Sequence, residues 1–528
     1  MRRWMLLLGL IALVVINSGW ATEGGPLDIA RYFPEGPLVF ARTPDLKKLL
    51  PAIKNHPLEK LYAGSEAAEK FHASKLYLKL ADRFKEAEKL SGIRLSYEKI
   101  LEVAGGESGL ALYDIGDLKM VFLTAAPRDK VLKSEFGSAR DRFEERRKGD
   151  QLYYVITNES GAVFAFAMVD RWLLVSNDLK RFERSLALIG GAGEDNLAGD
   201  PRFKSAVPES FHAGDLTIVL DQESLNDNLY FKTYWLYRNA SALRWISSET
   251  LNLKFGSGVI EEQRWFGLNE DAAGAPSHVN VSDLARWPRN SMWLDVSTNS
   301  DASEISSYIA KWAMGDRAGG VGDYVAQIAN MIEPAKPVAV ARLAAPRVEG
   351  AGFWLDERRL VAIKLGAPRA LKGSDLRAAI AKRWSDMVGA GGLINASFAA
   401  HNGVETLSLP LMEGAGPAIL EKDGLLIISN DAGLIREYVS APPAPGFETA
   451  NDTFTRVEVS TCAAHFSRLY RILARRSNWK YNESESFFSE EAPSFLKAVG
   501  GVKLALIRGR RADKRYIEEV RYELAAGK

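Results

Sequence analysis

Cysteine is nearly absent from the sequence, since Cys462 is the single one in 528 residues. A lone cysteine cannot form a disulfide within the chain, so the fold must be held by its apolar cores. The six histidines form no His-x-His or H-E-x-x-H pair of the kind used by dedicated zinc sites. The G-x-S-x-G elbow, the Walker loop and a complete dinucleotide turn are also missing. The sequence therefore predicts no catalytic residue, metal ligand or cofactor site, and favours a non-enzymatic role.

An excess of charge of either sign is missing too, with 68 basic and 67 acidic residues. Such a balance gives no overall attraction to nucleic acid, so we expect no nucleic-acid partner. The hydrophobic content of 47%, with 12 Trp and 23 Phe, indicates packed globular domains rather than disorder.

The longest apolar run lies at the start of the chain. Arg2 and Arg3 precede an apolar run from Leu6 to Ile16, and Gly19-Trp20-Ala21 forms a small-x-small site. This pattern predicts a cleavable export signal over residues 1–21. The run is shorter than the roughly 20 residues of a membrane span, although an uncleaved anchor is the alternative. We expect a periplasmic or secreted protein without a transmembrane helix after cleavage.

Four segments occur twice in the same order. FPEGPLVFART at 33–43 matches WPRNSMWLDVS at 287–297, and FLTAAPR at 122–128 matches IKLGAPR at 363–369. The other two pairs are WLLVSND at 172–178 with LLIISND at 425–431, and VIEEQRWFGL at 259–268 with YIEEVRYEL at 516–524. Their offsets of 241 to 257 residues indicate two copies of one unit rather than a solenoid, whose repeats span about 20–50 residues.

The duplication predicts the domain boundaries. Copy one covers 32–270 and copy two covers 287–526, and the polar stretch 271–286 is expected to be a linker. Within each copy, short apolar strands alternate with helical stretches, the helices being expected over 69–90, 134–148 and 374–387. The predicted fold is α+β, with two tandem homologous lobes, each a mainly antiparallel sheet with helices packed on it.

The repeated Ser-Asn-Asp motif predicts a strand that turns directly into a helix. WLLVS and LLIIS suit buried strands, and Asn177, Asp178, Asn430 and Asp431 belong to types preferred as helix N-caps. Apolar residues recur four and eight positions after each Asp, as expected for an amphipathic helix. We therefore assign these four residues to structural caps rather than to catalysis.

Two further groups of polar residues are candidates for a catalytic or metal site. The adjacent pairs Glu261-Glu262 and Glu518-Glu519 lie in alternating strands, so their side chains should point to opposite faces and cannot act together. Cys462 and His465 share a face if their segment is helical, which would suit a nucleophile pair or metal half-site, with a buried structural cysteine as the alternative.

One cationic cluster is predicted at the tip of the last hairpin. It consists of Arg508, Arg510, Arg511, Lys514 and Arg515, and copy one has KFGSGVI at the corresponding place. These cations could contact an anionic surface as a peripheral membrane site, or simply keep a hairpin tip solvated.

Three motifs together resemble those of a bacterial family of exported proteins known only as a domain of unknown function. They are YFPEGPLVFARTPDL at 32–46, LAGDPRFKSAVPESFHAGDLTIVLD at 197–221 and DRWLLVSNDLKRFERSL at 170–186. Copy two keeps DGLLIISNDAGLIREYV at 423–439 but has NDTF at 451–454 in place of the Asp-Pro-x-Phe step. The resemblance implies an exported location and a fold, and it transfers no catalytic residue.

These observations lead to three hypotheses. The first is an exported envelope protein that binds or scaffolds an unknown partner protein or ligand, in the groove between its two lobes. The second is a carrier of a lipid or another apolar ligand, and the third is a hydrolase without a recognisable motif.

Overall fold

A computed structural model describes most of the chain. It covers residues 28–56, 75–207, 214–228, 246–269, 279–298, 321–346, 357–388, 396–408, 417–463, 501–512 and 514–525, with a few single positions between 59 and 73 and between 302 and 309. The chain forms two compact units. The first comprises Met1–Gly274, Ala512–Glu518 and Ala526–Lys528, and the second comprises Ala275–Arg511 and Glu519–Ala525. The predicted export signal lies outside the described residues.

The first unit alternates strands with short helices. Its strands are β1 (Val39–Thr43), β2 (Ser108–Leu112), β3 (Met120–Ala125), β4 (Glu144–Lys148), β5 (Gln151–Thr157), β6 (Val163–Val169), β7 (Trp172–Ser176), β8 (Leu216–Asp221), β9 (Ile246–Gly256) and β10 (Val259–Leu268). Its helices are η1 (Asp28–Tyr32), α2 (Leu46–Lys54), α5 (Lys75–Ser91), α6 (Tyr97–Val103), α7 (Arg128–Lys133), α8 (Glu135–Ser138), η2 (Arg140–Arg142), α9 (Leu179–Ile189), α10 (Pro201–Ala206) and α11 (Gln222–Asp227).

The second unit repeats this alternation. Its strands are β11 (Trp293–Ser297), β12 (Pro337–Pro346), β13 (Glu357–Leu365), β14 (Ser397–His401), β15 (Val404–Ser408), β16 (Ala418–Lys422), β17 (Leu425–Ser429), β18 (Thr453–Val457) and β19 (Val502–Ala512). The terminal strand β20 (Arg515–Leu524) is divided between the two units after Glu518. Its helices are α15 (Val321–Ile332), η5 (Glu333–Ala335), η6 (Pro368–Ala370), α16 (Gly373–Val388) and α17 (Ala432–Ser440).

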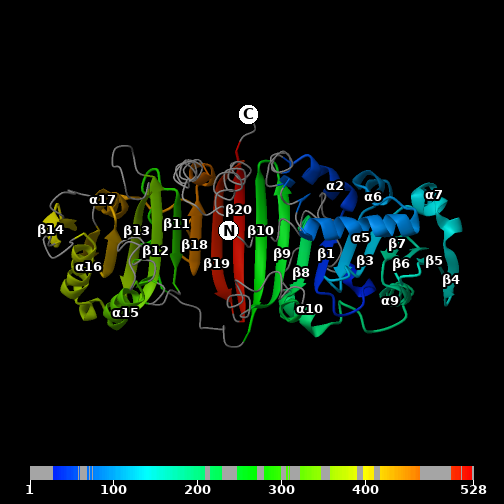
Figure 1. The fold of residues 1–528 in the computed structure, drawn as a ribbon, viewed down its shortest axis with the longest axis horizontal. Coiled ribbons are helices and arrows are strands. Elements are labelled where there is room, and N and C mark those ends of the chain that lie inside the picture. Colours follow the sequence, from blue (N-terminus) through cyan, green and yellow to red (C-terminus); the bar gives the residue numbers. More distant parts are fainter. Residues whose placement is uncertain are drawn as a thin grey trace. The chain divides into compact units, whose positions relative to one another are not determined.

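The strands of the two units are paired in the same order. In the first unit the order is β4-β5-β6-β7-β3-β2-β1-β8-β9-β10, with antiparallel neighbours throughout. In the second it is β14-β15-β16-β17-β13-β12-β11-β18-β19, and β19 pairs with β20. Figure 1 labels all strands of the first order except β2, and β14, β13, β12, β11, β18 and β19 of the second. The four sequence matches fall on equivalent strands. The prediction of an α+β fold with a mainly antiparallel sheet is confirmed.

Helices cover both faces of each sheet. In β7, Leu174 packs with α9 on one face, whereas its neighbour Leu173 packs with the residues near α5 and α8 on the other. In β17, Ile427 lies on the α17 face and Ile428 on the face of α15 and α16. Because four of the five residues in each of these strands are buried, the strand sequences are nearly continuous apolar runs instead of alternating ones.

Two boundaries differ from the sequence predictions. Residues 279–286, predicted as linker, belong to the second core, because Val281, Leu284 and Ala285 are buried there. The equivalent residues of η1, Ile29 and Ala30, are buried in the first core, before the predicted start at residue 32. In the sequence, the few apolar residues of 279–286 and of η1 lie among polar ones, so neither segment shows a clear apolar pattern.

The predicted helix over 134–148 is wrong at its end. Residues 144–148 form β4, which pairs with β5 through a two-residue turn at Gly149 and Asp150. All five residues of β4 are charged and most are exposed, which resembled an exposed helix in the sequence. Charged side chains are typical of a strand at the edge of a sheet, where they oppose pairing with other chains.

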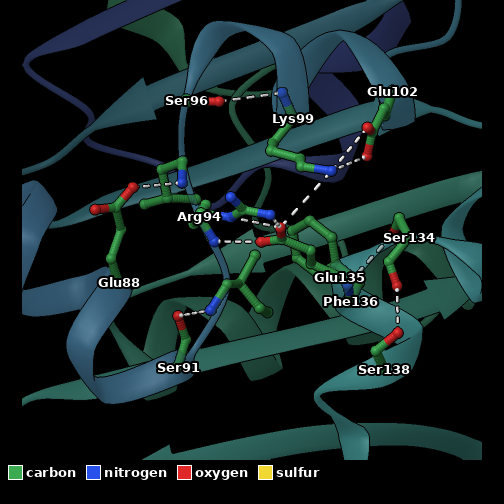
Figure 2. Close-up of polar contacts among 12 residues, drawn as sticks. Glu88, Ser91, Arg94, Ser96, Lys99, Glu102, Ser134, Glu135, Phe136 and Ser138 are labelled. Carbon is green, nitrogen blue, oxygen red and sulfur yellow. Dashed lines mark hydrogen bonds and ion pairs between the residues drawn. The ribbon is translucent and has the colours of Figure 1, made fainter.

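A polar network fixes the connection between α5 and α6 to α8 (Figure 2). The Glu135 carboxylate accepts hydrogen bonds from the backbone N–H of Arg94 at 2.6 Å and from its Nε at 2.7 Å. Glu88 accepts from the backbone N–H of Leu95 at 2.7 Å. Burial alone would raise the pKa of Glu135, but the bonds from Arg94 and the charge of Lys99 bring that pKa below its ordinary value.

We therefore predict an acid-sensitive contribution from Glu135. The lowered pKa stabilises the fold above the ordinary pKa of about 4.3, and this stabilisation is lost as the pH falls through the folded value. Glu135→Gln should lower the unfolding free energy of the first unit by about 1 kcal/mol at pH 7 and by much less at pH 3. Urea unfolding at both pH values measures this. Glu102→Gln, which alters a more exposed carboxylate bound to Lys99, is the control. An equal effect of Glu135→Gln at both pH values would contradict the prediction.

Candidate functional site

The Ser-Asn-Asp motifs form the same hydrogen bonds in both units. Asp178 is the N-cap of α9, and its side chain accepts from the backbone N–H of Arg181 at 3.1 Å. Asp431 caps α17 in the same way, accepting from the backbone N–H of Leu434 at 3.0 Å. In each unit the N–H of the Asp also donates to the hydroxyl of the motif serine at 3.0 Å. These carboxylates are therefore engaged in starting their helices.

The asparagines of these motifs do not cap the helices as the sequence predicted. Asn177 accepts from the backbone N–H of Met120 at 2.8 Å and donates to the carbonyl of Leu118 at 3.0 Å. Asn430 makes the equivalent bonds to Arg359 at 2.7 Å and to Glu357 at 3.0 Å. Each amide thus satisfies backbone groups at or next to the start of the neighbouring strand. This role depends on a segment more than 50 residues away, so no local pattern could reveal it.

The cationic cluster is only partly free to meet an anionic surface. Arg508 lies well inside β19, where its Nε donates to the carbonyl of Gly446 at 2.9 Å and its Nη1 pairs with Glu448 at 3.0 Å. Arg515 donates to the carbonyl of Ser205 at 2.9 Å. Arg510 and Lys514 are exposed, and Arg511 is half-buried. The structure therefore commits at least two members of the predicted cluster to other contacts.

Cys462 is buried, and His465 lies outside the described residues. The thiol is 8% exposed and donates to the carbonyl of Met292 at 3.5 Å. Burial, together with the charges of Glu357 and Glu458, raises the pKa of Cys462 to about 12. A thiol in this setting is a poor nucleophile at neutral pH, because the thiolate is the reactive form.

We predict that folded Cys462 resists thiol reagents. With its pKa near 12, the thiolate fraction at pH 8 is at least about 1,000-fold smaller than that of an ordinary cysteine with pKa 8.5. Labelling with 5,5′-dithiobis(2-nitrobenzoate) should be slow in buffer. In about 6 M guanidinium, which unfolds the chain, labelling should be complete within minutes. Fast labelling without denaturant would contradict a structural role for this residue.

The glutamate pairs lie on opposite faces of their strands. In β10, Glu262 is 2% exposed and accepts from Arg264 at 2.6 and 2.9 Å, whereas Glu261 is exposed. Within the described residues, no group of three or more His, Cys, Asp and Glu side chains is arranged to hold a metal ion.

A pocket that the sequence did not predict lies inside the first unit. It encloses about 460 Å³, is open to solvent, and lies where four chain segments meet. Its described lining residues are Asp45, Lys47, Ala104, Gly105, Gly106, Ala125, Ala126, Pro127, Lys130 and Arg171. They come from the start of α2, the connection between α6 and β2, the end of β3 with the start of α7, and the turn between β6 and β7.

Backbone hydrogen bonds connect these four segments. Lys47 N–H donates to the carbonyl of Gly105 at 3.1 Å, Gly106 N–H to that of Ala125 at 3.1 Å, and Ala126 N–H to that of Arg171 at 2.8 Å. A Cβ at position 105 would collide with the Ala125 carbonyl oxygen, so this close approach requires glycine. The floor of the pocket is therefore fixed by main chain.

Three cations surround this floor. Lys47, Lys130 and Arg171 are exposed, and none of them takes part in an ion pair within the part of the chain that the structure describes. The Arg171 guanidinium lies 4.7 Å from the ring centroid of Trp172. Among the described lining residues the one carboxylate is Asp45, which caps α2 by accepting from the Lys48 N–H at 3.0 Å. The pocket is therefore electropositive.

The second unit lacks two of these cations at the matching positions. Its turn between β16 and β17 has Gly424 where the first unit has Arg171, and the preceding Asp423 and Asp170 both have φ 51°. In the match of AAPRDK with GAPRAL, Lys130 corresponds to Leu371, which packs against the second core. This difference between the two units is the sequence signal that could have located the pocket.

Comparison with known proteins does not assign the chain to a family. No protein-family model matches it, and a search of curated proteins finds no match. Crystal forms III and I of TP0453 each match at 12% identity and a TM-score of 0.25, covering 46% and 48% of this chain and 80% and 81% of that one. Form IV matches at 10% identity and a TM-score of 0.24, covering 45% and 79%. Similarity at this level says nothing about function, and the resemblance to an exported family stays a prediction.

Within the described residues, no helix has the length and apolar character that crossing a membrane requires.

Proposed function

We propose that the protein is an exported, non-catalytic binding protein, and that it binds a small ligand in the pocket of its first unit. The observation that carries this proposal is the pocket itself. It combines a main-chain floor with three exposed cations, and its volume falls in the range of about 300–1,000 Å³ typical of small-molecule sites. The Asp45 carboxylate at its edge is occupied as a helix cap, which favours binding over acid–base chemistry.

We further propose that the two units are copies of one ancestral module. Identical strand orders and identical hydrogen bonds at the two Ser-Asn-Asp steps support this. After a duplication one copy can keep a purely structural role while the other acquires a ligand site. The loss or gain of cations at Arg171 and Lys130 fits such a division.

Export and binding are tested together on the protein from its own host. Cell fractionation with N-terminal sequencing should place the mature chain outside the cytoplasm, beginning after Ala21. Native mass spectrometry of that material should detect a non-covalently bound small molecule that denaturation releases. A cytoplasmic protein, or one that carries no ligand and binds none from a host metabolite extract, would overturn the proposal.

A further inference from the structure

We propose that the first-unit pocket binds an organic phosphate, that is, a phosphate ester with a small apolar portion. This inference rests on the proposed binding function and names its ligand class. Lys47, Lys130 and Arg171 line this one pocket from three different segments and are exposed, so an anion there would meet positive charge from each of these segments. Lysine supplies a mobile point charge, and arginine supplies paired N–H donors that match phosphate oxygens.

The floor of the pocket favours an ester over inorganic phosphate. Ala104, Ala125, Ala126 and Pro127 contribute apolar surface beside the cations, and the volume of about 460 Å³ exceeds that needed for a single phosphate group. The amides of Lys47, Gly106 and Ala126 already donate to carbonyls, so side chains must provide the recognition. An anion with an attached organic group uses both the charged opening and the apolar floor.

The matching positions of the second unit sharpen this assignment. Gly424 and Leu371 stand there in place of Arg171 and Lys130; the two-residue turn is kept, whereas the short η6 takes the place of α7 and Leu371 follows its end. Arg171 is therefore not needed for the turn, and the exposure of all three cations indicates that the fold of the first unit does not depend on them. Replacing them in the first unit should leave the structure intact and remove only the binding.

The test uses the full chain and two probes, phenyl phosphate in solution and vesicles of phosphatidylglycerol in phosphatidylcholine. Calorimetry should detect phenyl phosphate binding that weakens with salt, because the contacts are solvent-exposed ion pairs. The variant Lys47→Met/Lys130→Met/Arg171→Met should bind about 1,000-fold more weakly, since it removes three charge-assisted contacts that are each worth roughly tenfold. The control Lys89→Met/Lys180→Met/Lys204→Met removes the same charge from exposed sites outside the pocket and should bind like the wild type.

The outcomes distinguish a soluble phosphate ester from a lipid headgroup. They also distinguish failure of the organic-phosphate assignment from failure of the proposed binding function. Pocket-dependent binding of phenyl phosphate alone indicates a soluble ester, and pocket-dependent binding of the vesicles alone indicates a lipid headgroup. Equal losses in both triple variants, or no binding of either probe, would overturn the organic-phosphate assignment. If the host-purified protein still carries a ligand in that case, the binding function stands and only the ligand class fails. Circular dichroism confirms that each variant is folded.

Discussion

Replacing Phe182 by alanine is expected to lower the free energy of unfolding of the first unit by about 3–5 kcal/mol. The Phe182 side chain is fully buried on α9, and its ring lies 5.4 Å from that of Tyr153 on β5. The surrounding sheet is fixed by strand pairing on both sides of β6 and β7 and cannot collapse into the space left by the ring. The variant therefore loses both the burial of the ring and the contacts around the cavity.

Urea unfolding measures the change, and hydrogen exchange followed by mass spectrometry assigns it to the first unit. Leu78→Ala is the matched control, because Leu78 lies on α5 of the same unit but is 50% exposed. Because Leu78 is half-exposed, its replacement should change the unfolding free energy by no more than about 0.5 kcal/mol. Similar effects of the two substitutions would contradict the core described above.

Glu107→Ala is expected to destabilise the first unit by about 3 kcal/mol, because it leaves a buried cation without its partner. The Arg42 side chain on β1 is 4% exposed, and its Nε and Nη2 donate to Glu107 at 3.2 and 3.0 Å. Glu107 itself is 20% exposed, so water can replace part of the lost interaction. The expected loss therefore lies at the lower end of the range for a buried pair.

The double variant Arg42→Met/Glu107→Ala completes the test. Removing both charges avoids the unpaired guanidinium, so much of the stability lost in Glu107→Ala should return. The measurement is the unfolding free energy of the four members of this double-mutant cycle. If the double variant were less stable than Glu107→Ala, the interpretation of Arg42 as a buried, partner-dependent cation would be wrong.

The sequence predicted the strands well and the polar contacts poorly, for a physical reason. Runs such as WLLVS are visible because burial on both faces requires every residue to be apolar. Asn177 was assigned to the wrong role because its partners, Met120 and Leu118, belong to a different strand region. A capping interaction depends on the next three residues, but a bond across the sheet depends on the pairing of distant strands.

The pocket was missed for the same reason. Lys47, Gly105, Lys130 and Arg171 are spread over more than 120 residues, and each is unremarkable in its own segment. Only the pairing of β3 with β2 and β7 brings their segments together. Once the two units are aligned by strand order, the positions at which they differ in charge become informative.

Because Cys462 is buried, oxidation of its thiol reports that the surrounding structure has opened. Two molecules can become covalently linked through this sulfur only after each has opened enough to expose it, because the closed form keeps it away from solvent. After storage in an oxidising buffer, the amount of disulfide-linked dimer therefore reports how often the second unit has opened. Reduction identifies this dimer, because it converts the dimer back to monomer. Destabilising substitutions near β11 should raise that count long before bulk unfolding becomes visible.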